Sequence, residues 1–135
     1  MVSSQTRNEI EESLGQVPSW IEGIAEPASD HSWGLFRDLS FGETELTPRE
    51  KALIGVGVAA SINCPYCAHF HKEEARMADV TEDEVEEAVT LASSTRYSST
   101  VLHGTEVDLD DFVTETSEII EYLREQEAEP AAGAN

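Results

Sequence analysis

Apolar and small residues fill the segment from Ala52 to Ile62, where they recur on every side of a predicted helix. Just before it, Thr47-Pro48-Arg49-Glu50 has the features of a helix start: a threonine that can cap the N3 amide, a proline at N1 and a glutamate that can reach back to the cap. The pattern therefore predicts a helix over 48–62. Because this helix has almost no polar face, we expect it to be buried, either within the chain or in an oligomer.

The pattern downstream predicts three more helices. Asn63 permits a turn into a helix over about 65–78, and the capping box at 81–84 opens the next one. The helical pattern then loosens over 97–104. Asp108 can cap a last helix whose apolar side chains recur at helical spacing.

The rest of the chain fits an all-α fold. Residues 1–46 read as short helical pieces broken by prolines and glycines, and no segment shows the alternation of a strand. We expect a single helical domain over 1–127, composed of an N-terminal extension (1–46) and a core (47–127). The small residues of 128–135 predict a disordered tail.

The acidic net charge of the chain argues against two classes of binding partner. The chain has 8 basic and 28 acidic residues and a formal net charge of -20, which repels nucleic acids and anionic membranes, so we expect neither as a partner. The charge is spread along the chain, which favours adaptation to high salt over an acidic mimic that binds a basic protein. No secretory signal and no run long enough to cross a membrane is visible, so we expect a cytoplasmic protein.

The only two cysteines, Cys64 and Cys67, are spaced C-x-x-C at the start of the predicted second helix, with His71 four residues beyond. In a regular helix these three residues lie within roughly 60° of one another, whereas His69 points roughly 140° away from Cys64. A helix N-terminus and a nearby imidazole both lower the pKa of a thiol, and a second thiol can close a disulfide. The spacing therefore favours a redox dithiol with His71 as its base. A catalytic metal site and inert buried thiols remain the alternatives.

The segment from Leu46 to His71, with Leu-Thr-Pro-Arg-Glu-Lys, an apolar helix and then C-x-Y-C-x-x-x-H, resembles the carboxymuconolactone decarboxylase and AhpD-like alkylhydroperoxidase family. The likeness extends over about residues 33–115. It implies an AhpD-like helical bundle with the C-x-x-C at the N-terminus of a core helix, and subunits assembled as trimers or hexamers. It also implies that Cys67 attacks the peroxide, that Cys64 resolves the product and exchanges with an external dithiol, and that His71 belongs to the proton relay.

One position departs from the family pattern. Peroxidase members have a glutamate twelve residues before the first cysteine, where this chain has Ala52. Glu50 lies about 200° around the helix from that position and is a poor substitute. Glu74 follows His71 by three residues on the same predicted helix, so it could orient the imidazole, although a solvated carboxylate is an equal reading. Tyr66, between the cysteines, is a possible binding residue or a packing residue.

The sequence thus predicts an antioxidant thiol-dependent peroxide reductase without a metal or other cofactor. Its partners would be a small hydroperoxide, a dithiol donor that is either a protein or a lipoyl group, and further copies of the chain. The alternatives are a decarboxylase that acts on a lactone acid, which has no evident need for paired cysteines, and a non-catalytic, redox-responsive oligomer.

Overall fold

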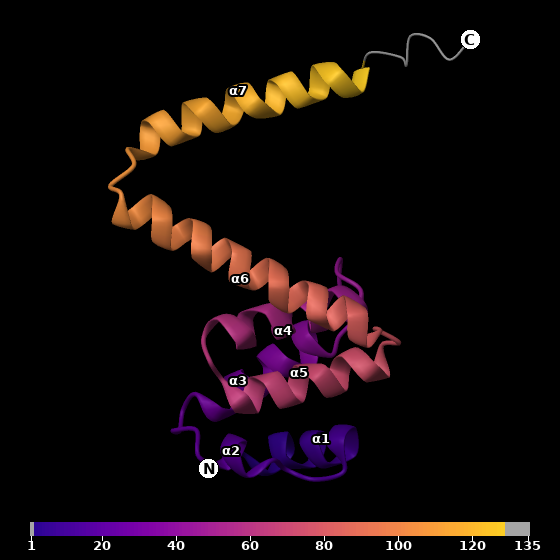
Figure 1. The fold of residues 1–135 in the computed structure, drawn as a ribbon. Helices are drawn as coiled ribbons and strands as arrows, with labels where there is room; N and C mark the ends of the chain where they lie inside the picture. The colour runs from indigo at the N-terminus through magenta and orange to yellow at the C-terminus, as the bar shows by residue number, and fades with distance from the viewer. Residues whose placement is uncertain (1, 129–135) are drawn as a thin grey trace, which may run out of the picture. The chain divides into compact units, whose positions relative to one another are not determined.

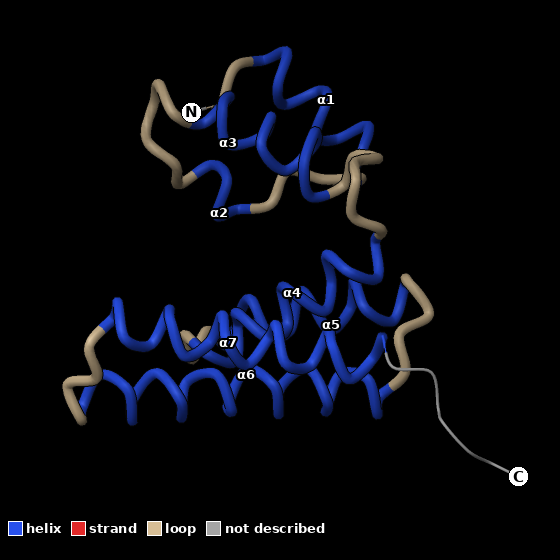
Figure 2. The backbone as a smooth tube through the Cα atoms, turned by 90° about the horizontal axis from the view of Figure 1, so that it is seen from above, coloured by secondary structure: helices blue, strands red, loops and turns tan. Residues whose placement is uncertain are grey.

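The computed structural model describes residues 2–128, which are helical almost throughout and contain no strand (Figures 1 and 2). This confirms the prediction of an all-α fold. The elements in chain order are α1 (Ser4–Leu14), α2 (Ser19–Glu22), α3 (Ser29–Leu35), the π-helical turn η1 (Phe36–Ser40), α4 (Pro48–Ser61), α5 (Pro65–Met77), α6 (Glu82–Gly104) and α7 (Leu109–Ala128).

The chain divides into two compact units, Met1–Ala92 and Ser93–Asn135. The boundary falls within α6, so this helix contributes its first half to one unit and its second half to the other. The prediction of one domain over 1–127 stays a prediction. The end of the predicted tail, 129–135, lies outside the described residues, whereas Ala128 is the last residue of α7.

Two apolar clusters form the core of the first unit. One gathers α1, α2 and α3 around four buried side chains: Val2, Ile10, Ile21 and Trp33. The other joins α4 to α5 and is made of small side chains: Ala52, Ala75 and Val80 are buried, with Leu53, Ala78 and Val85 against them. Small residues at a helix contact let the two backbones approach closely, and α4 and α5 pack together accordingly.

The caps that the sequence predicts are present. The Thr47 side chain accepts a hydrogen bond from the Glu50 amide, and the Glu50 carboxylate accepts one from the Thr47 amide at 2.6 Å, with Pro48 at the first position of α4. Thr81 and Glu84 form the same reciprocal pair before α6. Asp108 Oδ1 accepts hydrogen bonds from two amides in the first turn of α7.

Two residues in the left-handed region of backbone conformation turn the chain around α5. Asn63 (φ 55°) joins α4 to α5, and Asp79 (φ 55°) follows the end of α5. Asparagine and aspartate tolerate this conformation better than most residues with a Cβ. The turn at Asn63 lets the Cys64 amide donate to the Ala59 carbonyl at 3.1 Å, which fixes the entry into the cysteine helix.

Two cations tie α4 to its neighbours. Lys51 donates to the carbonyl oxygens of Leu39 and Gly42, each at 2.7 Å, and so attaches α4 to the end of η1 and to the loop that follows it. Arg49 donates to the Asp79 carbonyl at 2.6 Å, which attaches the start of α4 to the turn after α5.

One feature differs from the predictions, and another bears on the expected burial of α4. The loosened pattern over 97–104 is nevertheless helical, because α6 continues without a break to Gly104. In α4, Ala52, Gly55, Val56 and Ala59 are buried, whereas Ile54, Val58 and Ile62 are 54%, 52% and 61% exposed. These three side chains, spaced four residues apart, form an exposed apolar stripe on α4 and its C-cap residue Ile62, so packing within the first unit covers only part of this helix.

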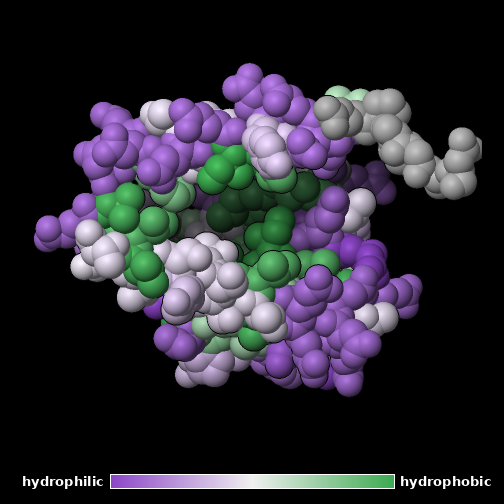
Figure 3. Space-filling view, turned by 45° about the horizontal axis from the view of Figure 1, so that its top comes forward, coloured by the Kyte–Doolittle hydropathy of each residue, from purple (hydrophilic) through white to green (hydrophobic). Residues whose placement is uncertain are grey.

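The second unit likewise exposes apolar side chains. No residue of α7 is buried, although its apolar side chains recur at helical spacing: Leu109, Phe112, Val113, Ile119, Ile120 and Leu123. Figure 3 shows green apolar side chains exposed among purple hydrophilic ones on the face that it presents. Within residues 2–128 no helix combines the length and the apolar content needed to cross a membrane.

Candidate active site

The cysteine pair lies at the N-terminus of α5. Cys64 is the N-cap residue, and its Sγ accepts a hydrogen bond from the Cys67 amide at 3.1 Å, while Pro65 occupies the first helical position. Proline fits there because its missing N–H has no helical partner in the first turn. The two cysteines are joined by a disulfide that spans one turn, with their Cα atoms 5.3 Å apart. Both residues are partly exposed, so a reagent in solution can reach the pair.

The local field favours a thiolate when this disulfide is opened. The first-turn amides of a helix carry a partial positive charge that is close to both sulfur atoms here. An anion at Cys64 also keeps the hydrogen bond from the Cys67 amide, which is stronger to a charged acceptor. These two effects lower the free energy of the reactive form of a cysteine.

His71 lies one turn beyond Cys67 and is held from two sides. Its Nδ1 is 2.6 Å from Oε2 of Glu74, and the two side chains are only 29% and 24% exposed. On the other side the imidazole rests on α4 at Gly55. A Cβ added to Gly55 would come within 2.6 Å of Cε1 of the ring, and closer still to Nδ1 and Cγ. Only glycine leaves room for the ring in this position.

Aromatic side chains border this arrangement. The Phe70 ring lies 5.3 Å from the His71 ring between centroids, and Phe41 lies 6.4 Å from Phe70 on its other side. Tyr66, between the cysteines, is 85% exposed, and His69 is also exposed. Tyr66 therefore presents its ring to solvent beside the disulfide, which leaves a binding role for it as a prediction.

The position of the missing glutamate is apolar in this chain. Ala52 is 1% exposed and lies in the same cluster as Ala75 and Val80. Glu50 is engaged at the helix start, where Oε2 accepts from the amide and the hydroxyl of Thr47. These hydrogen bonds, that from the amide first, hold the pKa of Glu50 below its ordinary value. The carboxylate that contacts His71 therefore comes from α5.

The sequence placed Cys64, Cys67 and His71 on one helix face and Glu74 three residues beyond His71, and the structure brings His71 and Glu74 into contact. It did not identify Gly55 as part of the site. The signal for it in the sequence is a glycine within an apolar helix, which indicates close approach of another helix and not contact with a particular side chain. Among residues 2–128 no three His, Cys, Asp or Glu side chains are grouped so that they could hold a metal ion.

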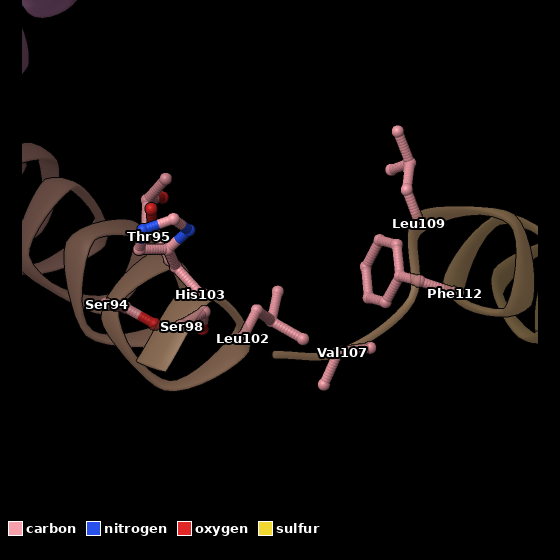
Figure 4. Close-up of a pocket in the computed structure, with 9 residues that line it drawn as sticks. Ser94, Thr95, Ser98, Leu102, His103, Val107, Leu109 and Phe112 are labelled. Atoms are coloured by element: carbon pink, nitrogen blue, oxygen red, sulfur yellow. The ribbon is translucent and has the colours of Figure 1, made fainter. Parts of the chain in front are cut away.

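A separate hollow of about 560 Å³ lies in the second unit (Figure 4). Its lining comes from the end of α6 and the start of α7: Ser94, Thr95, Ser98, Ser99, Leu102, His103, Val107, Leu109 and Phe112. His103, to which the sequence assigned no role, lines this hollow with hydroxyl and apolar side chains. The hollow is shallow and its residues are mostly exposed, so we assign the candidate active site to α5.

The fold and the site together define an all-α protein that carries a cysteine pair and an anchored imidazole at the start of one core helix. Comparison with known proteins agrees. The model of the carboxymuconolactone decarboxylase family matches residues 27–108, so the chain belongs to this family.

Three known proteins illustrate the relationship. A crystal structure of a protein from Methanobacterium thermoautotrophicum is 33% identical, with a TM-score of 0.55, over 65% of this chain and 97% of that one. The crystal structure of the alkylhydroperoxidase AhpD core from Rhodospirillum rubrum has a TM-score of 0.68 at 22% identity, over 82% of this chain and 84% of that one, which shows a shared fold. Uncharacterized protein 4 in the cox locus of Paracoccus denitrificans is 33% identical over 64 residues, which are 47% of this chain and 58% of that protein.

Proposed function

We propose that the protein is a thiol-dependent hydroperoxide reductase in which Cys67 is the peroxidatic cysteine and Cys64 the resolving one. The observation that carries this proposal is the cysteine pair at the N-terminus of α5, able to join in a disulfide and followed one turn later by an anchored imidazole. The AhpD-like fold supports the same conclusion. The reaction needs no metal or organic cofactor.

The first half of the cycle oxidises the cysteines. His71 takes the thiol proton of Cys67, directly or through a water, and the thiolate attacks the terminal oxygen of the hydroperoxide. The S–O bond forms as the O–O bond breaks, and the alkoxide that leaves takes the proton from the imidazolium. Cys64 then attacks the sulfenic acid on Cys67, which forms the disulfide and releases one water molecule.

The second half returns the electrons. An external dithiol, carried by a protein or a lipoyl group, attacks the disulfide through a mixed disulfide and leaves as a cyclic or internal disulfide itself. The sum is the conversion of one hydroperoxide and one dithiol into an alcohol, a water molecule and an oxidised donor. The partly exposed position of both cysteines is consistent with such a large reductant.

We also propose that copies of the chain assemble through the exposed apolar stripe on α4 (Ile54, Val58 and Ile62) into a homo-oligomer, a trimer or a hexamer. We propose a second copy of the chain as the partner because every copy also exposes apolar side chains on α7, and these need the same kind of cover. Burial of large apolar side chains contributes roughly 1.5–3 kcal/mol each, which outweighs the repulsion between acidic surfaces when salt screens it.

The test is an assay of the reduced protein in concentrated KCl with hydrogen peroxide and cumene hydroperoxide, and with dihydrolipoamide as the donor. We expect the wild type to turn over and both thiols to disappear on oxidation. Cys67→Ser should abolish peroxide consumption, whereas Cys64→Ser should form a sulfenic acid that dimedone traps. His71→Ala should slow the oxidation by about a hundredfold or more.

Three results would contradict this function. Persistent turnover in Cys67→Ser would exclude the assigned nucleophile. Oxidation of the wild-type thiols without catalytic turnover for any dithiol donor would instead indicate a non-catalytic, redox-responsive protein. Decarboxylation of a lactone acid by the Cys64→Ser, Cys67→Ser double variant would instead identify a decarboxylase.

A further inference from the structure

The contact between His71 and Glu74 determines which ring nitrogen holds the proton. An ionised carboxylate only accepts hydrogen bonds, and Oε2 of Glu74 lies 2.6 Å from Nδ1. In the neutral imidazole Nδ1 must therefore carry the hydrogen, which leaves the lone pair on Nε2. The nitrogen able to take a proton is thus the one that Glu74 does not contact.

The same contact fixes the orientation of the ring. Nδ1, Cγ and Cε1 are the ring atoms nearest to the position that a Cβ on Gly55 would occupy. This edge of the ring is therefore held between the bare backbone of α4 and the Glu74 carboxylate. Because both side chains are less than a third exposed, water competes only weakly for the hydrogen bond.

Glu74 is the carboxylate for this contact because α4 supplies none. Ala52 is buried in an apolar cluster, and Glu50 caps its own helix. The neighbouring acid on α5, Glu73, is paired with Arg76 and its side chain is 48% exposed. The groups that hold the His71 ring are therefore Glu74 on the same helix and Gly55 on α4.

We propose that Glu74 is a positioning residue that holds His71 in the tautomer with Nδ1–H, and that Gly55, which has no Cβ, leaves the space that the ring occupies. Its part in catalysis rests on the proposed function. When Nε2 takes the proton from Cys67, the positive charge of the imidazolium is stabilised by the adjacent carboxylate, which itself stays ionised. The proton passes on to the alkoxide, so Glu74 is neither consumed nor oxidised.

The test compares Glu74→Ala with the matched control Glu73→Ala in the full-length, reduced protein. The first readout is the ¹⁵N chemical shifts of the His71 ring, assigned from the spectrum of His71→Ala. The second is the rate at which iodoacetamide alkylates Cys67 in a Cys64→Ser background. Far-UV circular dichroism checks that α5 remains helical.

We expect Glu73→Ala to match the wild type in both readouts. Glu74→Ala should lose the Nδ1–H signature, and its alkylation should slow by about tenfold, the lower end of the losses seen when the partner that orients a metal-bound histidine is removed. Glu74→Gln, whose amide oxygen can still accept from Nδ1, should recover part of the tautomer and rate. A mere packing role would leave the tautomer unchanged.

An unchanged ring spectrum and alkylation rate in Glu74→Ala would overturn the proposal, and so would equal effects in Glu73→Ala. Neither readout uses a peroxide. A wild type that fails to reduce hydroperoxides would therefore contradict the proposed function alone, while the tautomer and the alkylation rate would still decide the role of Glu74.

Discussion

Replacing Gly55 by alanine should destabilise the protein, whereas replacing Gly57 by alanine should stabilise it. In a helix interior, alanine is favoured over glycine by about 1 kcal/mol when its Cβ finds room. At Gly57 it does, since the nearest atoms are Cβ of Ala92 at 3.7 Å and the Ala88 carbonyl oxygen at 3.8 Å. We therefore expect Gly57→Ala to stabilise the protein by about 1 kcal/mol.

At Gly55 the added methyl group would lie within 2.6 Å of Cε1 of His71, more than 1 Å inside an ordinary carbon–carbon contact of about 3.5–4.0 Å. The imidazole must then leave its place and give up the hydrogen bond to Glu74. A hydrogen bond to a charged group contributes about 1.5–3 kcal/mol, and the partial exposure of both side chains places this one in the lower half of that range, at about 2 kcal/mol. After the gain in helix propensity, we expect Gly55→Ala to be destabilised by about 1 kcal/mol.

The two variants should therefore differ by about 2 kcal/mol, or by about 1 M in the midpoint of urea unfolding. The measurement is made on the oxidised protein at one concentration in concentrated KCl, so that assembly and the disulfide are held constant. Gly55→Ala should also lose the ring signature of Nδ1–H, and Gly57→Ala should keep it. If both variants gain the same stability, the His71 ring does not rest on α4 at Gly55.

Three further predictions concern pH, salt and assembly. Hydrogen bonds from Thr47, that of its amide first, lower the pKa of Glu50 below 4.5, so this carboxylate adds stability above its ordinary pKa that is lost as the pH falls through the lowered one. The Tm should thus fall between about pH 5 and about pH 3, and Glu50→Gln should flatten this fall relative to the wild type. With a net charge of -20, the protein should show a Tm that rises with KCl, and a Tm equal in dilute and concentrated salt would argue against adaptation to high salt. For the proposed assembly through α4, light scattering should show a wild-type oligomer and smaller species for Val58→Glu, whereas a monomeric wild type would exclude this assembly.

Local sequence signals predicted the framework of the fold well. The starts of α4, α6 and α7 follow from side-chain caps whose partners are three residues away or fewer, and these hydrogen bonds are formed as expected. The face shared by Cys64, Cys67 and His71 follows from helical geometry alone. Such signals are short in range, so a single sequence is sufficient to read them.

The parts that were missed depend on contacts between distant segments. The continuation of α6 through 97–104 has no strong local pattern, and the contact of the His71 ring with Gly55 is visible only when α4 and α5 are packed together. The assignment of Glu74 lies between these cases. Its spacing allowed the contact with His71, but a solvated carboxylate has the same spacing, and the hydrogen bond to Nδ1 and the partial burial of both side chains distinguish the two.

The apolar cluster at Ala52 constrains how this site can change over generations. A carboxylate introduced at position 52 would enter the packing around Ala75 and Val80 and would force α4 away from α5. The backbone of α4 at Gly55, against which the His71 ring lies, would move with it. Moving the acid from one helix to the other therefore cannot proceed by a single substitution. The two ways of supplying it are separated by intermediates that have either a disrupted helix contact or an imidazole without a partner.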